Sequence, residues 1–357
     1  MTVFNPNNKG YVSKKYPLFL GDDLGLFDTV NITYPKIEEL YQKQVSQIWN
    51  EVEIDLTQDR MDMLNLPKEV VDLMVKTISW QHLADSVAAK SIAGLLIPHC
   101  TNSELEGMLT VQSFFECIHS RTYSHIVKQT FVDPNVMLDQ TYNDIGVLLR
   151  SKAIVDAFDA LESLPKTASR KEKQQALIKA FAALFALEAI AFMSSFAVTF
   201  AIVETDVFQG IGSLVALITR DEVLHTRMDY TVLDCLLKDE EWAAVAVECK
   251  DDVKKILDSV VEQELKWADY LFSEGRQVVG LNAELLKEYT QHMAKPVYDF
   301  IGVDFDFKVV AENPLPYMDK YIDPSQMQSA AQEIQLTSYN VGAIVNDTAD
   351  IDFSFDF

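Results

Sequence analysis

The feature that most constrains the fold is a segment, residues 167–209, that contains neither glycine nor proline and can therefore form one very long helix. Within it, residues 182–203 are nearly all apolar, and that length would suffice to span a bilayer. Glu188 lies inside this apolar part, however, and an ionisable group within a membrane span is costly. No second apolar segment of this kind occurs in the sequence. We therefore expect no membrane span, but the central helix of a large bundle, apolar on all sides because other helices surround it.

The remainder of the chain also carries helical patterns. It has no Asn-Gly or Asp-Gly hairpin between alternating runs, and neither a G-x-G-x-x-G motif nor a P-loop. A capping-box pattern at Ser103 and Glu106 predicts the start of a helix whose apolar residues then recur at intervals of three and four. A first helix is predicted from about residue 34 past residue 49, and further helices at about residues 67–96, 103–131, 142–163, 167–209, 211–237, 253–273 and 283–300. These lengths predict an all-α helical bundle.

Composition excludes several classes of function. The chain has 357 residues, of which 48% are hydrophobic, as in globular proteins. Its formal net charge of -24 argues against nucleic-acid binding, which needs clustered lysine and arginine. The four cysteines form no C-x-x-C pair, so neither a zinc site nor a redox motif is indicated. Because the N-terminus has no apolar signal core, we expect a reduced, cytoplasmic protein.

Three parts of the chain differ in character. Residues 1–33 are rich in asparagine, glycine and proline and are expected to be irregular, whereas residues 34–320 form the predicted helical domain. Residues 321–357 contain no basic residue, are polar and acidic, and end in DTADIDFSFDF. We expect this tail to be flexible. The three phenylalanines of that ending would have no use on a passive tail, so we expect the tail to dock into a groove of a partner protein.

Two of the predicted helices carry the same pair of residues. The stretch FFECIHSRTYSHI contains Glu116 and His119, and the stretch RDEVLH contains Glu222 and His225. Residues three apart are neighbours on a helix, so each pair presents a carboxylate and an imidazole at one spot. Acidic residues are 54 of 357, so a single match means little, but two matches on strongly apolar helices are more informative. Two such helices that face each other can hold two metal ions.

Helical bundles that bind two metal ions in this way also use one carboxylate from each of two further helices. The best candidates are acidic residues inside apolar helices, namely Glu188 in ALFALEAIAFMSSF and Asp85 in WQHLADSVAAKS. A buried carboxylate without a partner is costly, so each requires a cation or a donor. Four carboxylates balance two divalent ions, and one imidazole per ion completes a set that suits iron or manganese better than zinc. The predicted metal ligands are Asp85, Glu116, His119, Glu188, Glu222 and His225.

Each of these residues has a simpler explanation when it is taken alone. A single buried histidine is more often a hydrogen-bonded core residue than a ligand. Asp85 on its own could be a solvated helix residue. Only the combination of all six residues on four helices favours a dinuclear metal site over these explanations.

Three phrases, FFECIHSRTYSHI, LEAIAFMSSF and RDEVLH, resemble the radical-generating small subunit of class I ribonucleotide reductase, from about residue 20 to the tail. The tail phrase SYNVGAI is similar to the aerobic enterobacterial type. The resemblance implies a ferritin-like bundle whose dinuclear site activates oxygen and oxidises a nearby tyrosine to a stable radical. The matching tyrosine is Tyr123, which by spacing alone could be a core residue with a local hydrogen bond. Residues that match the apolar pocket around the radical are Phe192, Phe196 and Ile218.

The same resemblance implies that the radical is relayed to a separate large subunit, which reduces ribonucleotides to deoxyribonucleotides. The matching relay positions are Trp49, Asp221 and Tyr339, and Asp221 is expected to bond to His119. Family members are homodimers, and the C-terminal tail would dock on the large subunit. A di-iron site is the first expectation, but the same ligands also suit a dimanganese or a mixed manganese–iron site.

Two other functions would use similar ligands. Another di-iron carboxylate enzyme, an oxidase or hydroxylase acting on a small molecule, would need neither Tyr339 nor an aromatic acidic tail. A ferritin-like storage protein would be much shorter and would form a cage. The resemblance therefore implies an oxidoreductase of the ribonucleotide reductase small-subunit family, and these two alternatives are less favoured.

Overall fold

The apolar segment singled out in the sequence lies at the centre of the protein. The computed structural model describes residues 4–323. In it, α9 (Arg170–Ala186), the π-helical turn η4 (Leu187–Phe192) and α10 (Met193–Val203) follow one another as a single helical rod. Arg170–Val203 is the only helix of the described part that is long and apolar enough to cross a membrane, and 94% of its most apolar window is buried inside the protein. This burial is what the predicted central helix of a bundle requires.

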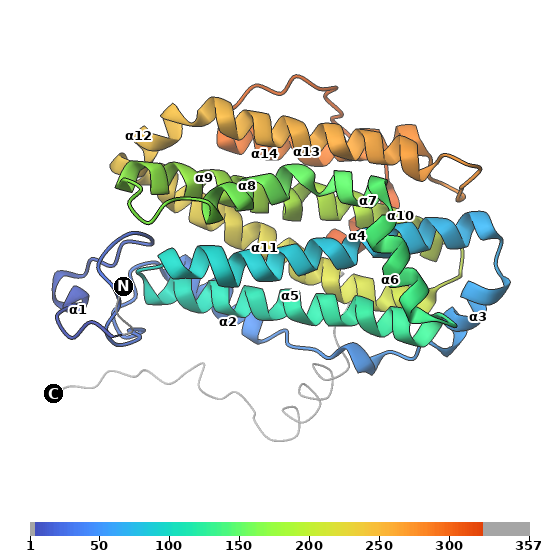
Figure 1. The fold of residues 1–357 in the computed structure, drawn as a ribbon, viewed down its shortest axis with the longest axis horizontal. Coiled ribbons are helices and arrows are strands. Elements are labelled where there is room, and N and C mark those ends of the chain that lie inside the picture. Colours follow the sequence, from blue (N-terminus) through green and yellow to red (C-terminus); the bar gives the residue numbers. More distant parts are fainter. Residues whose placement is uncertain (1–3, 324–357) are drawn as a thin grey trace, which may run out of the picture.

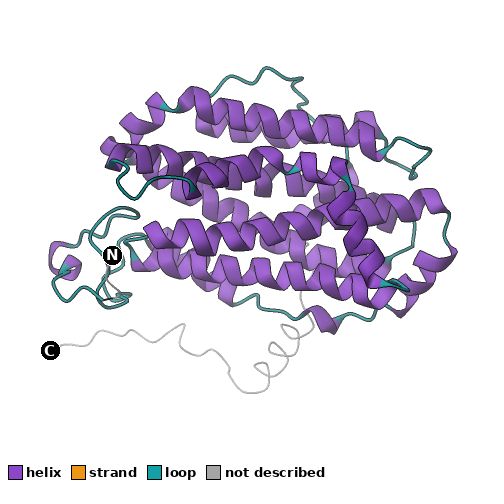
Figure 2. Ribbon diagram, viewed as in Figure 1, coloured by secondary structure: helices purple, strands orange, loops and turns teal. Residues whose placement is uncertain are grey.

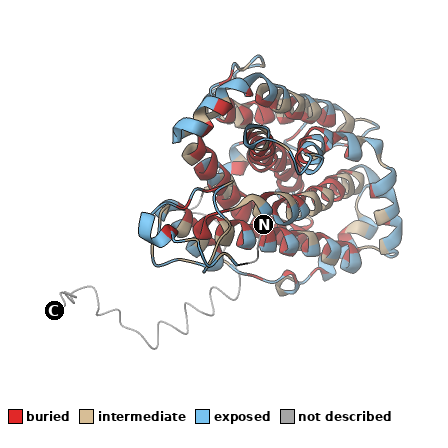
Figure 3. Cartoon of the chain, turned by 60° about the vertical axis from the view of Figure 1, so that its left-hand side comes forward, coloured by how far each residue is buried: buried red, intermediate tan, exposed pale blue. Residues whose placement is uncertain are grey.

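Long helices cover the central rod on several sides. Helices α13 (Lys250–Leu271) and α14 (Ala283–Ile301) lie above it in Figure 1, and α4 (Lys68–Ser91) and α5 (Ser103–Thr130) lie below it. Helix α11 (Gln209–Lys238) packs against η4, α9 and α10. Figure 3 shows the buried residues on the faces that these helices turn toward one another. The core therefore extends along the rod, between the helices that cover it.

Shorter helices complete the described part of the chain, which contains no β-strand (Figure 2). Only two isolated backbone bridges occur there, Phe19 with Cys100 and Val278 with Leu281. The prediction of an all-α protein is therefore confirmed. The remaining helical elements are α1 (Gly10–Ser13), α2 (Pro35–Val45), η1 (Glu51–Glu53), α3 (Thr57–Asn65), η2 (Ile92–Leu96), η3 (Ile97–His99), α6 (Pro134–Asn143), α7 (Ile145–Arg150), α8 (Lys152–Glu162), α12 (Glu240–Glu248), η5 (Pro316–Met318) and α15 (Asp319–Ile322).

The prediction of a helix over residues 34–49 is wrong at its C-terminal end. Helix α2 ends at Val45, and Trp49 lies in the irregular segment that follows. The Asn50 side chain then accepts a hydrogen bond from the Val52 amide at 3.1 Å and caps η1. An asparagine that bonds to the backbone two residues further on favours a turn over a continued helix.

The cap of one predicted helix and the extent of another differ from the structure. Helix α5 begins at Ser103 as predicted, but its N-cap is Asn102, whose side chain accepts from the Leu105 amide at 2.9 Å. The prediction of one helix over residues 142–163 is wrong, because α6 ends at Asn143 and two separate helices, α7 and α8, follow it. The Asp144 side chain accepts from the Val147 amide at 3.2 Å and caps α7. In both cases a short polar side chain at the helix start satisfies an amide that the helix itself leaves free.

Helix α3 fixes the start of α11. The Asp59 carboxylate accepts hydrogen bonds from the amides of Gly210 (3.2 Å) and Ile211 (2.8 Å), and Asp62 accepts from the Phe208 amide (2.8 Å). Carboxylates at a helix N-terminus satisfy free amides and oppose the positive end of the helix dipole. A side chain at Gly210 would collide with Asp59, so this close approach requires glycine. Helix α11, which carries one of the two Glu-x-x-His pairs, is thereby held in place.

Candidate metal centre

The six predicted metal ligands come from four helical segments and meet inside the bundle. Each side chain is completely buried, with no exposed surface. Helix α4 contributes Asp85 and η4 contributes Glu188, whereas α5 and α11 each contribute a Glu-x-x-His pair. The sequence folds in this way because the apolar face of each helix turns inward, and the polar residue on that face is carried into the core with it.

These residues form two overlapping groups, and in each group the potential ligand atoms lie within 4.8 Å of one another. Glu116 and Glu222 belong to both groups, one from α5 and one from α11. Ions held by the two groups would share these two carboxylates, as in a dinuclear centre. The first group is Asp85, Glu116, His119 and Glu222, and the second is Glu116, Glu188, Glu222 and His225.

Both imidazole rings turn Nδ1 toward the shared carboxylates. His119 Nδ1 lies 2.8 Å from Glu222 Oε1, and His225 Nδ1 lies 2.8 Å from Glu116 Oε1. The opposite nitrogen of His119, Nε2, lies 3.2 Å from Asp221 Oδ2. A hydrogen that Nε2 donates to Asp221 leaves the lone pair of Nδ1 free to bind a metal.

Asp221 also links the cluster to Trp49. The indole Nε1 of Trp49 donates to the same Asp221 Oδ2 at 2.7 Å. The Trp49 ring stacks near the His119 ring, with centroids 6.2 Å apart and planes at 26°. Trp49 is 2% exposed, and Asp221 is fully buried. Three residues predicted from the sequence therefore form one hydrogen-bonded chain that leads from the segment after α2 to the cluster.

Two of the four carboxylates of the cluster, Asp85 and Glu188, lack hydrogen-bond donors among the described residues. Neither oxygen of Asp85 or of Glu188 has a hydrogen-bond partner within residues 4–323. Burial raises the pKa of both carboxyl groups well above the usual range, and neighbouring carboxylates raise it further. Buried groups of this kind need cations to be stable in the ionised form. The donor set therefore fits two divalent ions.

The pKa values of the two imidazoles reflect the negative charge of the neighbouring carboxylates. Burial alone would lower the pKa of His225, but the charge of Glu222 and the contact with Glu116 raise it to about 10. For His119 too, burial acts to lower the pKa, but the neighbouring carboxylates raise it well above its usual value. Burial would raise the pKa of Glu222, yet the two imidazoles hold it below the usual range. Protons on the imidazoles thus offset part of the charge, and metal binding would release them.

Tyr123 lies one helical turn beyond His119 on α5. It is completely buried, and its hydroxyl has no hydrogen-bond partner in the described part of the chain. Burial, together with the charge of Asp85, raises the pKa of Tyr123 well above its ordinary value, so the phenol keeps its proton. Phe192, Phe196 and Ile218 are also fully buried, and the two phenylalanine rings stack with centroids 5.6 Å apart.

Sequence reasoning missed one further carboxylate near the cluster. Asp229 follows His225 by one turn on α11, is completely buried, and has no hydrogen-bond partner for either oxygen among the residues described. Burial raises the pKa of Asp229 well above its usual value, although the charge of His225 acts in the opposite direction. The spacing of four residues from a predicted ligand, on an apolar helix face, is the signal that could have identified it.

A comparison with known protein families identifies the family of this chain. Residues 26–314 match the family described as "Ribonucleotide reductase, small chain". The matched residues include the whole carboxylate–histidine cluster and Tyr123. The chain belongs to the ribonucleotide reductase small-chain family.

Small-chain relatives extend the similarity to nearly the whole sequence. Ribonucleoside-diphosphate reductase 1 subunit beta of Escherichia coli O157:H7 is 30% identical over 360 residues, 95% of this chain and 95% of the relative. The subunit beta of Buchnera aphidicola subsp. Baizongia pistaciae is 31% identical over 372 residues, 99% of this chain and 98% of the relative. The chain is therefore a small subunit of ribonucleoside-diphosphate reductase, a component of an oxidoreductase, and another di-iron oxidase or hydroxylase is not favoured.

Solved ribonucleotide reductase structures have the same fold. The R2 subunit from Clostridium botulinum superposes with a TM-score of 0.78 at 21% identity, covering 90% of this chain and 98% of that one. A Streptococcus sanguinis protein described as dimanganese(II)-NrdF gives a TM-score of 0.67 at 19% identity, covering 85% and 100%. These likenesses confirm the predicted ferritin-like bundle.

Proposed function

We propose that the cluster binds two divalent metal ions and that Tyr123 carries the stable radical of this ribonucleotide reductase subunit. The observation that supports the proposal is the pair of ligand groups that share Glu116 and Glu222. A purely structural ion-pair cluster would not leave both oxygens of Asp85 and Glu188 without a donor. Each ion would take one imidazole and three carboxylates, two of them shared.

Iron and manganese suit this ligand set. It is rich in oxygen and supplies one imidazole per ion, whereas structural zinc prefers four tetrahedral ligands with more nitrogen or sulfur. We assign a di-iron centre first, with dimanganese or mixed manganese–iron as alternatives. When bound, the ions supply the oxidising power, through reaction with oxygen, that removes one electron from Tyr123.

The protein's own residues protect and connect the oxidised tyrosine. The depth of Tyr123 keeps water and external reductants away, and we assign Phe192, Phe196 and Ile218 to the apolar wall around it. Trp49 and Asp221 are assigned to the relay, because their hydrogen bonds join the surface segment after α2 to His119.

The remaining assignments concern partners. The family implies a large catalytic subunit, and the proposed contact with it is the C-terminal tail, with Tyr339 as the relay residue; both lie outside the described residues. We further propose a homodimer in the cytoplasm. The four cysteines form no disulfide in the structure, which is compatible with a reducing compartment.

Electron paramagnetic resonance tests the assignment of Tyr123. The metal-free protein would be loaded with Fe(II) and exposed to oxygen, and a tyrosyl radical signal is expected. Tyr123→Phe should abolish the signal completely while two ions still bind, because phenylalanine keeps the ring volume but has no oxidisable hydroxyl. Tyr289→Phe is the matched control, since Tyr289 is equally buried and its hydroxyl also lacks a partner within the described residues. An undiminished signal in Tyr123→Phe would refute the assignment.

A truncation tests the proposed docking of the tail. Removal of residues 347–357 should leave the radical signal intact and abolish ribonucleotide reduction with the large subunit of the same organism. Retained reduction at the full rate would rule out a docking role for these residues.

A further inference from the structure

The metal-binding candidate Glu188 lies in a π-helical turn whose carbonyl groups are bonded by side chains. The turn η4 inserts extra chain into the helical rod, so residues after it point in directions that a regular helix would not give. Ser194 Oγ donates to the Ile190 carbonyl at 2.9 Å, and Arg150 Nη2 donates to the Ala191 carbonyl at 3.1 Å. Side-chain donors inserted into the hydrogen-bond ladder are a known cause of such distortions.

Arg150 is a buried cation with several close contacts. Its Nε and Nη2 atoms each donate to one oxygen of Glu264 at 2.7 Å, which forms a bidentate pair. The guanidinium carbon lies 3.5 Å from the centre of the Trp80 ring and 4.8 Å from that of Trp267. Arg150 is 3% exposed and Glu264 is 2% exposed. A buried ion pair is a poor source of stability compared with apolar packing, so this pair calls for another role.

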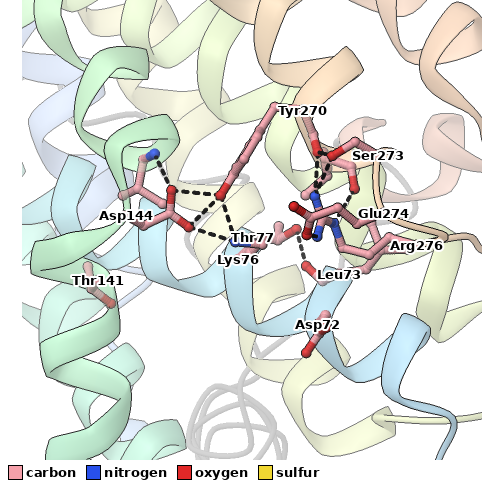
Figure 4. Close-up of polar contacts among 12 residues, drawn as sticks. Asp72, Leu73, Lys76, Thr77, Thr141, Asp144, Tyr270, Ser273, Glu274 and Arg276 are labelled. Carbon is pink, nitrogen blue, oxygen red and sulfur yellow. Dashed lines mark hydrogen bonds and ion pairs between the residues drawn. The ribbon is translucent and has the colours of Figure 1, made fainter.

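The helix that carries Arg150 is fixed at its other end as well. Figure 4 shows Lys76 from α4 and Tyr270 from α13 converging on Asp144, the N-cap of α7. Lys76 Nζ lies 2.7 Å from Asp144 Oδ2, and the Tyr270 hydroxyl donates to the same carboxylate at 2.9 Å. Arg150 is the last residue of α7. Its position is therefore set by α4 and α13 together, which also supply Trp80 and Glu264.

We infer that Arg150 and Glu264 are a positioning pair that holds η4 in its π-helical form and thereby sets the Glu188 carboxylate in the metal centre. The pair ties α7 and α13 to the Ala191 carbonyl, three residues after Glu188. Trp80, stacked on Arg150, also meets Phe192 edge-on at 5.5 Å, so the end of the turn is fixed too. This inference rests on the proposed metal function.

The test replaces both members of the pair in the full-length protein. Arg150→Met combined with Glu264→Gln removes the bond to η4 without leaving a lone charge in the core. We expect binding of Mn(II) by the group that contains Glu188 and His225 to weaken about tenfold or more, since changes behind a ligand typically have that effect. The group that contains Asp85 should keep its affinity. Titration of the metal-free protein, followed by electron paramagnetic resonance, distinguishes an isolated Mn(II) ion from a coupled pair.

A second buried arginine, whose carboxylate partner is exposed, provides a control. Arg276 is 4% exposed, donates to the Leu271 and Tyr270 carbonyls at 2.7 and 2.6 Å, and pairs with Glu274 (Figure 4). It does not contact η4 in any hydrogen bond or ion pair of the described residues. Arg276→Met with Glu274→Gln should therefore lower thermal stability while both Mn(II) ions bind with unchanged affinity. Wild-type affinity for both ions in the Arg150 double variant would overturn the inference, and so would equal weakening in the two double variants.

Two further variants complete the test. If the Arg150 double variant does not fold, Arg150→Lys replaces it, because lysine keeps the charge beside Glu264 but cannot reach both that carboxylate and the Ala191 carbonyl. The same selective weakening is expected, and its absence would again refute the inference. Glu188→Gln separates this inference from the proposed function. Unchanged Mn(II) binding in Glu188→Gln would refute the ligand assignment, whereas weakening there but not in the Arg150 variants would refute the positioning pair alone.

Discussion

Two clusters of buried charge meet at the turn η4, and they are built in opposite ways. In the pair of Arg150 and Glu264, one cation meets one carboxylate through two short hydrogen bonds. In the metal centre, four carboxylates surround two imidazoles, and the oxygens of Asp85 and Glu188 have no donor in the described part of the protein. In the first cluster the charge of Glu264 is balanced by Arg150, although Arg150 Nη1 has no hydrogen-bond partner among the described residues. The carboxylates of the second cluster would need bound cations, and this difference supports our proposal that the second cluster is a metal-binding site.

The largest expected effect is that of metal on stability. Each ion that binds only the folded state stabilises it by about 4 kcal/mol at a free concentration a thousandfold above its dissociation constant. We therefore expect Mn(II) or Fe(II) to raise the thermal midpoint of the wild-type protein strongly, and a chelator to reverse the change. Calorimetry with and without metal measures this. If the thermal midpoint does not depend on metal, the carboxylate–histidine cluster is not a metal site and both clusters are structural.

A smaller effect is expected from removing one member of the pair of Arg150 and Glu264. Glu264→Gln leaves the Arg150 charge buried without its carboxylate, and we expect the free energy of unfolding to fall by about 3 kcal/mol. The loss should be larger with metal than without it, because weaker binding of the ion on the Glu188 side also removes part of the stabilisation by metal. Urea unfolding with and without Mn(II) measures both values. Glu241→Gln is the control, because its pair with Arg170 is about half exposed and such pairs contribute about 1 kcal/mol or less. Equal losses in Glu264→Gln and Glu241→Gln would show that the buried pair matters no more for stability than an exposed pair.

The shared carboxylates offer a sharper comparison within the metal centre. Glu222 belongs to both ligand groups, whereas Asp85 belongs to one. We expect Glu222→Gln to weaken binding of both Mn(II) ions by about a hundredfold. Asp85→Asn should weaken only the ion on the His119 side. Metal analysis after gel filtration measures the number of ions that each variant retains. If Glu222→Gln and Asp85→Asn retain the same number of ions, Glu222 is not shared between the two groups.

The smallest effect is expected from Glu188→Gln in the metal-free protein. This change removes a buried carboxylate that has no donor, so the free energy of unfolding should stay the same or rise by about 1 kcal/mol or less. The same chemical substitution is thus expected to lower the free energy of unfolding at Glu264 but not at Glu188. A clear loss of stability in metal-free Glu188→Gln would show that this carboxylate has a structural partner of its own.

Local patterns in the sequence were sufficient for much of the fold and of the centre. Both Glu-x-x-His pairs could be placed because the motif and the apolar face lie within one helix. Asp85 and Glu188 could be singled out because an acidic residue within an apolar helix requires a partner. The long central helix followed from the absence of glycine and proline between residues 167 and 209, although it ends at Val203.

Other features depend on contacts between distant segments. The bond between Trp49 and Asp221 joins residues 172 positions apart, and no local pattern pairs these two residues. The pairing of Arg150 with Glu264 spans 114 positions. The π-helical form of η4 has no signature in its own residues, because the donors that bond its carbonyls include Arg150 from another helix. Such features arise from packing, which a single sequence does not display.

The burial of the central rod also bears on how the chain is synthesised. Residues 170–203 leave the ribosome before α11, α13 and α14, which provide much of their cover. Ile301, the end of α14, follows Val203 by 98 positions (301 − 203), so at about 5–20 residues per second the full cover arrives roughly 5–20 s later. During that interval the most apolar helix of the protein is open to aggregation and to machinery that recognises membrane segments. The nascent chain is therefore expected to need chaperone protection at this helix until α14 has been made.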